Sequence, residues 1–223
     1  MSHLSQGAFY RRWVWANGWA ELLGLGATLL LGWFGTRAFS PADASPLIIL
    51  AGAFAAIVFG TLLEGILIGF AQARVLHDRL AALAPRSWIL ATASGAAVAW
   101  ALGMIPSTVI NLLNSQPASP MSEFPDSPQY LLAAAMGMVL GVILGSSQWR
   151  VLRHHVPHAG FWVGANAVAW TIGMPLIFLG MDTLSENASV TRIGLTVLAT
   201  CLAAGLAVGA IHGWALIRLL RQN

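Results

Sequence analysis

The sequence predicts an all-α membrane protein: six transmembrane helices, arranged as three tandem helical hairpins with approximate threefold symmetry about the membrane normal. Three observations support this fold class: an apolar composition, six long apolar segments and a motif that occurs three times. Of the 223 residues, 57% are hydrophobic and 9% are charged, and the mean hydropathy is +0.74. An average soluble domain carries about 25% charged residues. The composition excludes an ordinary soluble enzyme, a disordered tail and a nucleic-acid-binding protein, and it indicates one integral-membrane domain over residues 1–223.

Six segments are long enough to cross a bilayer as helices, because a hydrocarbon core about 30 Å thick requires about 20 apolar residues. A helix also satisfies its own backbone hydrogen bonds, as a membrane span must. The first segment exceeds the apolar run of about 7–15 residues in a cleavable signal peptide, so we expect it to remain as a helix. The expected spans are residues 12–35, 47–73, 87–106, 130–152, 160–181 and 193–217.

The arginines indicate the orientation of these spans. In a six-span arrangement nine arginines fall on one side, and only Arg37 and Arg192 fall on the other. Because cytoplasmic loops are enriched in Lys and Arg, we expect both termini to be cytoplasmic, in a bacterial inner membrane. The nine are Arg11, Arg12, Arg74, Arg79, Arg86, Arg150, Arg153, Arg218 and Arg221.

A motif of the form G-x-x-x-G-x-x-Q-x-x-x-L occurs in every even-numbered span, with His in place of Gln in the last copy. Each odd-numbered span carries a weaker signature, a Trp followed by Ala and then by Asn or Thr. Hairpins in one orientation are related by rotation about the membrane normal, as in parallel-repeat transporters. The hairpins cover residues 12–79, 87–155 and 160–220 approximately. The motif copies are Gly65, Gly69, Gln72 and Leu76; Gly141, Gly145, Gln148 and Leu152; and Gly205, Gly209, His212 and Leu216. The signature copies are Trp13, Ala16 and Asn17; Trp88, Ala91 and Thr92; and Trp162, Ala165 and Asn166.

The repeated polar residues Gln72, Gln148 and His212 allow two interpretations. In the first, the glycine stripes are packing surfaces where a neighbouring helix approaches closely and the polar group bonds across the contact. In the second, the three side chains converge near the threefold axis and coordinate a ligand or surround a pore mouth. We expect no cofactor.

Most tryptophans near the predicted cytoplasmic ends are expected to form an aromatic belt at the membrane surface. Trp100 and Trp170 lie deeper, where we expect them to pack between helices or line a cavity. The expected belt consists of Trp13, Trp88, Trp149, Trp162 and Trp214.

Two acids, Glu21 and Glu64, lie inside the predicted membrane spans. Glu21 follows Arg12 by nine residues and Glu64 precedes Arg74 by ten, which places both roughly 14–15 Å from the cytoplasmic boundary. They belong to the two helices of one hairpin, so contact between them is plausible. An intramembrane acid costs about 2.5–3.5 kcal/mol on insertion scales and often marks an ion or proton pathway. The structural alternative is a protonated carboxyl that bonds a backbone carbonyl or a neighbouring helix.

Two loops stand out. His154, His155 and His158 are close enough in sequence to suggest a metal site, but no acid or Cys accompanies them, so we expect a solvated basic loop and no bound metal. The longest loop, at about 107–129, is rich in proline and is expected to be a lid or a docking surface.

The absence of P-loop, Rossmann, nucleophile-elbow and H-E-x-x-H motifs argues against an enzyme, although it does not exclude an intramembrane one. The favoured function is a small proton- or cation-linked carrier or channel with a polar site between the repeats. The alternative is a non-catalytic accessory or scaffold subunit of a larger membrane complex. The expected partners are the lipid bilayer, a small-molecule or ion ligand and another membrane protein, with no nucleic acid. The candidate ligand-binding residues are Glu21, Glu64, Asn17, Asn166, Gln72, Gln148 and His212.

Overall fold

The computed structural model describes residues 5–38, 45–114, 126–185 and 187–221, and every regular element in these ranges is helical. The elements are α1 (Gln6–Ala38), α2 (Pro46–Phe59), the π-helical η2 (Gly60–Gly65), α3 (Ile66–Leu76), α4 (Pro85–Asn114), α5 (Asp126–Leu152), α6 (Phe161–Asp182) and α7 (Val190–Leu220). Because α2, η2 and α3 are continuous, the described residues contain six helices long and apolar enough to cross a membrane. The predicted all-helical class is confirmed, and the helices fit a multi-pass membrane protein. The threefold symmetry remains a prediction.

The largest difference from the predicted spans is in α4, which continues past residue 106 to Asn114. Pro106 lies inside this helix. The Ser107 hydroxyl, next along the chain, donates to the carbonyl oxygen of Met104 at 3.0 Å. Side-chain bonds of this kind help membrane helices to tolerate a proline. The expected loop over 107–129 therefore begins later, and its residues 115–125 lie outside the described part of the chain.

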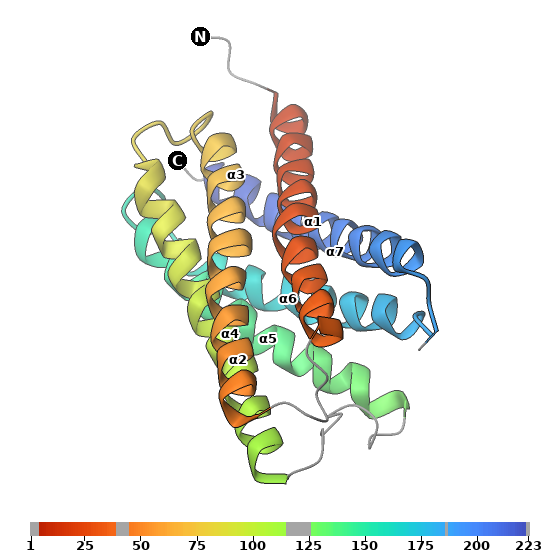
Figure 1. Ribbon diagram of the computed structural model, residues 1–223. Coiled ribbons are helices and arrows are strands. Elements are labelled where there is room, and N and C mark those ends of the chain that lie inside the picture. Colours follow the sequence, from red (N-terminus) through yellow and green to blue (C-terminus); the bar gives the residue numbers. More distant parts are fainter. Residues whose placement is uncertain (1–4, 39–44, 115–125, 186, 222–223) are drawn as a thin grey trace.

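The helices meet at one end of the molecule, called here the convergent end. Figure 1 shows α1, α3 and α4 running upright, with α5, α6 and α7 running across them. At the convergent end Arg12 of α1 pairs with Asp78, just after α3, at 2.7 Å. Arg221, just after α7, donates to the side-chain oxygen of Gln6 at 2.7 Å. The start of α1 and the ends of α3 and α7 therefore lie together.

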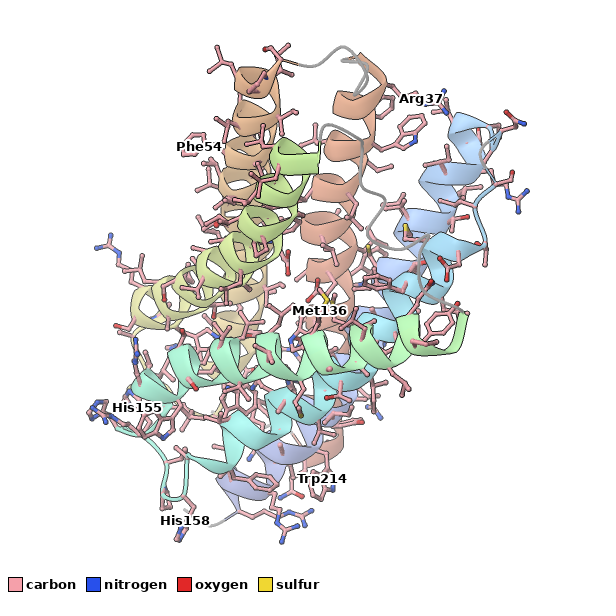
Figure 2. The ribbon with its side chains drawn as sticks, turned by 90° about the horizontal axis from the view of Figure 1, so that it is seen from below. Arg37, Phe54, Met136, His155, His158 and Trp214 are labelled. Carbon is pink, nitrogen blue, oxygen red and sulfur yellow. The ribbon has the colours of Figure 1, made fainter. Side chains whose placement is uncertain are left out.

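Three tryptophans and three leucines fill the convergent end and form what we call the tryptophan core. Each of the six side chains has an exposed fraction of 0%. The Trp162 ring centroid lies 6.0 Å from that of Trp13 and 6.0 Å from that of Trp88. The expected surface belt is therefore wrong for these three tryptophans, whereas Trp214 is 55% exposed and points outward (Figure 2). The core consists of Trp13, Trp88, Trp162, Leu76, Leu152 and Leu216.

The glycine stripes pack against helices of a neighbouring hairpin along three contacts, which we call seams. The first seam places α3 on α4, the second α5 on α6 and the third α7 on α1. A Cβ atom added at the second motif glycine would reach the Cα of the residue after the signature tryptophan in every seam. The distances would be 2.9 Å for Gly69 and Ile89, 2.9 Å for Gly145 and Val163, and 3.1 Å for Gly209 and Val14. The packing role expected of the glycines is confirmed, and since α7 packs on α1, the seams join the hairpins in a closed ring.

The outer half of the second span is the least buried part of the bundle. No residue of α2, all of which is described, is buried. Phe54 is 69% exposed and points away from the other helices in Figure 2. Such a surface suits lipid or an apolar partner.

Candidate functional site

One small cavity, lined by both polar and apolar side chains, lies next to the tryptophan core. Its volume is about 20 Å³, which is room for about one water molecule. Side chains from α1, η2, α3, α4, α5, α6 and α7 line it. The structure brings all seven candidate residues to this cavity: Asn17, Glu21, Glu64, Gln72, Gln148, Asn166 and His212. Whether they bind a ligand remains a prediction.

Gln72 connects α3 to three other helices through its amide. Its Oε1 accepts hydrogen bonds from the indole Nε1 of Trp88 at 3.0 Å and from Nε2 of Gln148 at 2.9 Å. Its Nε2 donates to Oδ1 of Asn17 at 2.8 Å. Since Gln72, Trp88, Gln148 and Asn17 are all buried, these bonds satisfy polar groups that have little access to solvent.

Gln148 repeats this pattern in the second seam. Its Oε1 accepts from Nε1 of Trp162 at 2.9 Å, and its Nε2 donates to the hydroxyl oxygen of Thr92 at 2.9 Å. In both seams the motif amide therefore accepts from the signature tryptophan of the next hairpin. The indole groups of Trp88 and Trp162 and the hydroxyl of Thr92 thus belong to the polar site, although none was among the candidates.

The last residue of each signature bonds back to the carbonyl oxygen of its own tryptophan. Asn17 donates to Trp13 at 2.8 Å, Thr92 to Trp88 at 2.9 Å and Asn166 to Trp162 at 2.9 Å. These bonds hold the three short polar side chains against their own helices. All three side chains line the cavity, where their oxygen atoms can still accept a hydrogen bond. The repeated spacing in the sequence was the available signal for this arrangement.

The third seam has a different chemistry, because His212 occupies the position of the motif amide. Its ring packs against Trp162, with the ring centroids 5.0 Å apart. Neither ring nitrogen of His212 makes a hydrogen bond with any described residue, and the same holds for Nε1 of Trp13. The bond between motif residue and signature tryptophan found in the first two seams is therefore not formed here.

The two buried acids, Glu64 and Glu21, differ in their hydrogen bonding. Glu64 lies in the π-helical η2, and its Oε2 accepts from Nε1 of Trp100 at 2.8 Å. Short π-helical segments inside helices are frequent at functional sites. Glu21 is 3% exposed and packs against Gly205 of α7, and its Oε2 makes no hydrogen bond within the described part of the chain. Trp100 was expected at this depth, but its bond to Glu64 was not foreseen.

The histidine-rich link before α6 is separate from the cavity. His155 and His158 lie at the outer edge of the molecule in Figure 2. Arg153 donates to the ring nitrogen of His154 at 3.4 Å. Among the described residues, no group of three His, Cys, Asp or Glu side chains is placed to hold a metal ion.

The cavity can accommodate a water molecule, a proton or a small ion, but its volume is far below the 300 Å³ or so of the smallest usual ligand pockets. Comparisons with protein-family models, with curated proteins and with solved structures find no match to this chain.

Proposed function

We propose that the chain is a polytopic inner-membrane protein that acts as a small proton- or cation-linked carrier or channel. The observation that carries this proposal is the meeting of two buried carboxyl groups and six other buried polar side chains at one cavity. Buried acids in membrane helices are costly, and they are usually retained for ion or proton pathways. The proposal includes no enzymatic step.

Two features of the packing support a transport architecture. The seams join each hairpin to the next and the last to the first, as expected for three hairpins related by approximate threefold rotation. The polar cavity lies between the hairpins, where parallel-repeat transporters bind their substrates. We further propose that the convergent end is cytoplasmic, since Arg12 and Arg221 lie there and cytoplasmic ends are rich in arginine.

The size of the cavity favours the proton over a larger solute. A space of about 20 Å³ holds about one water molecule, and a proton needs only a chain of hydrogen-bonding groups. The tryptophan core adjoins this space and is closely packed, so an organic solute could not pass without a large rearrangement. A proton-linked role therefore requires the least movement of the described helices.

Replacing both acids should abolish proton movement. In liposomes containing the purified protein and a pH-sensitive dye, a potassium diffusion potential should drive proton uptake by the wild type. Glu21→Gln combined with Glu64→Gln should lower the rate to that of empty liposomes, because glutamine keeps the shape of the side chain but cannot release a proton. Asp78→Asn, at the exposed ion pair, is the control and should leave the rate unchanged. Uptake by the double variant at the wild-type rate would contradict the proposal, as would a folded wild type with no uptake.

An accessory subunit remains the second candidate, and the exposed apolar surface of α2 favours it. That surface could contact a larger membrane protein instead of lipid. Native mass spectrometry of the protein gently extracted from its own membrane separates the two functions. A stoichiometric foreign subunit would support the accessory role, and a monomer or homo-oligomer would support the carrier.

A further inference from the structure

The third seam contains buried polar groups that have no hydrogen-bond partner among the described residues. These groups are both ring nitrogens of His212, Nε1 of Trp13 and Oε2 of Glu21, and none of them bonds to a described residue. A buried polar group without a hydrogen-bond partner is costly, so such groups normally have one. In the first two seams the corresponding tryptophan N–H groups, those of Trp88 and Trp162, donate to Gln72 and Gln148.

The spacing between His212 and Glu21 suits a bridging molecule better than direct contact. Glu21 packs against Gly205, because a Cβ atom added there would come 2.7 Å from Cβ of Glu21. His212 lies seven residues further along α7, which is about 10 Å along the helix axis. Both side chains line the cavity of about 20 Å³. A water molecule needs about this much space and two to four polar partners.

We propose that the cavity binds a water molecule that hydrogen-bonds to His212 and to Glu21, and that protons exchange through Glu21 and not through Glu64. The assignment of Glu21 as the exchanging acid rests on the proposed function, but the water site does not. The water site follows from the unsatisfied polar groups of the third seam and from a cavity large enough for one water molecule.

The proton transfer through this water balances without any further reactant. The Glu21 carboxyl gives its proton to the water, and the water gives one of its protons to a ring nitrogen of His212. The products are a carboxylate and an imidazolium, and the reverse transfer restores the starting state. The titratable groups that line the cavity are Glu21 on α1, Glu64 on η2 and His212 on α7. The lining residues from α4, α5 and α6 are uncharged.

The two acids differ in their freedom to exchange a proton. Oε2 of Glu64 already accepts a hydrogen bond from Trp100, and this donor holds the carboxyl in one orientation. Oε2 of Glu21 has no such partner among the residues described. Of the carboxyl oxygens of these two acids, Oε2 of Glu21 is the one that is buried without a hydrogen bond to a described residue, so it is the oxygen assigned to the water.

His212→Gln tests the proposal with a variant that should fold. It introduces the amide of the other two seams, which can accept from Trp13 and donate toward Asn166, as Gln72 does with Trp88 and Asn17. The melting temperature should therefore equal or exceed that of the wild type, while proton uptake in liposomes falls to the rate of empty liposomes. A merely structural histidine would leave uptake intact, and that result would overturn the relay.

A second experiment does not depend on transport. Water-edited solid-state NMR of protein labelled with ¹⁵N-histidine in lipid measures magnetisation that passes from water to each imidazole. The His212 signal is the one missing from the His212→Gln spectrum. We expect transfer to this signal in the wild type, a strong loss in Glu21→Leu, which removes a hydrogen-bond partner of the water, and no change in Glu64→Leu. No transfer to His212, or equal losses in the two variants, would overturn the water site. Transfer as expected in a protein that moves no protons would instead refute the proposed function alone.

Discussion

Replacing Gly141 with alanine is expected to cost about 1–3 kcal/mol or more of folding free energy, the range for overpacking a close contact. Gly141 lies in the second seam, where an added Cβ atom would collide with the carbonyl oxygen of Asn166 and come 2.8 Å from Cα of Ala167. Both atoms belong to the backbone of α6 and cannot turn aside as a flexible side chain could. The two helices would have to separate, which would also stretch the hydrogen bond that Gln148 accepts from Trp162 across the seam.

Thermal unfolding in detergent, followed by tryptophan fluorescence, measures this effect. The matched control is Gly103→Ala in α4, because no atom lies within 4 Å of the position that its Cβ would take. Alanine is favoured over glycine in a helix by about 1 kcal/mol, so the control should be neutral or slightly stabilising. Equal melting temperatures for the two variants would show that the second seam is not a close contact.

The glycine contacts could be predicted from the sequence, because glycine spacing on a helix determines which surface allows close approach. Gly65, Gly141 and Gly205 recur with the same neighbours at the same offsets, and each packs where the stripe places it. The seven polar candidates also meet at one cavity. Five of them belong to the repeated motif or to the aligned signature, so their convergence follows from the packing of those faces, whereas Glu21 and Glu64 belong to neither.

The spacing of the glycines did not predict whether the tryptophans lie at the membrane surface or in the core. An indole near the end of a span suits the membrane surface, where its N–H meets water, and it equally suits a core where the N–H meets an amide. Trp88 and Trp162 take the second environment, because Gln72 and Gln148 accept their N–H groups. Their recurrence with Thr92 and Asn166 was a signal for the core that helix-end position alone does not give.

Other features of the site depend on contacts between segments that the sequence does not relate. The bond from Trp100 to Glu64 crosses from α4 to η2, and neither residue belongs to the repeated motif. The π-helical turn that carries Glu64 has no recognisable sequence signature, and the small volume of the cavity depends on how all the helices pack. These features determine which acid is fixed by a hydrogen bond and how large a ligand the cavity can accept.

Replacing Gln72 with leucine should strongly destabilise the bundle. It removes three side-chain hydrogen bonds, to Trp88, Gln148 and Asn17. At about 0.6 kcal/mol for each bond, the average in one well-studied membrane bundle, the loss is about 2 kcal/mol. It rises to several kcal/mol if the indole N–H and the asparagine oxygen are left buried without partners, since each such group costs about 1–3 kcal/mol. Gln6→Leu is the control, because Gln6 bonds at the exposed surface and surface changes usually stay within about 0.5 kcal/mol.

A double-mutant cycle with Gln148→Leu shows whether the seams act together. Residues that share a hydrogen bond usually have an interaction energy of about 0.5–3 kcal/mol in such a cycle, and Gln148 donates directly to Gln72. The double variant should therefore lose less stability than the sum of the two single variants, because the second replacement removes a bond that the first has already broken. Strict additivity would mean that the first and second seams are energetically independent. The hydrogen-bonded groups of the first and second seams would then act separately, and a rearrangement in the third seam, where His212 lies, would not be transmitted from one of them to the other.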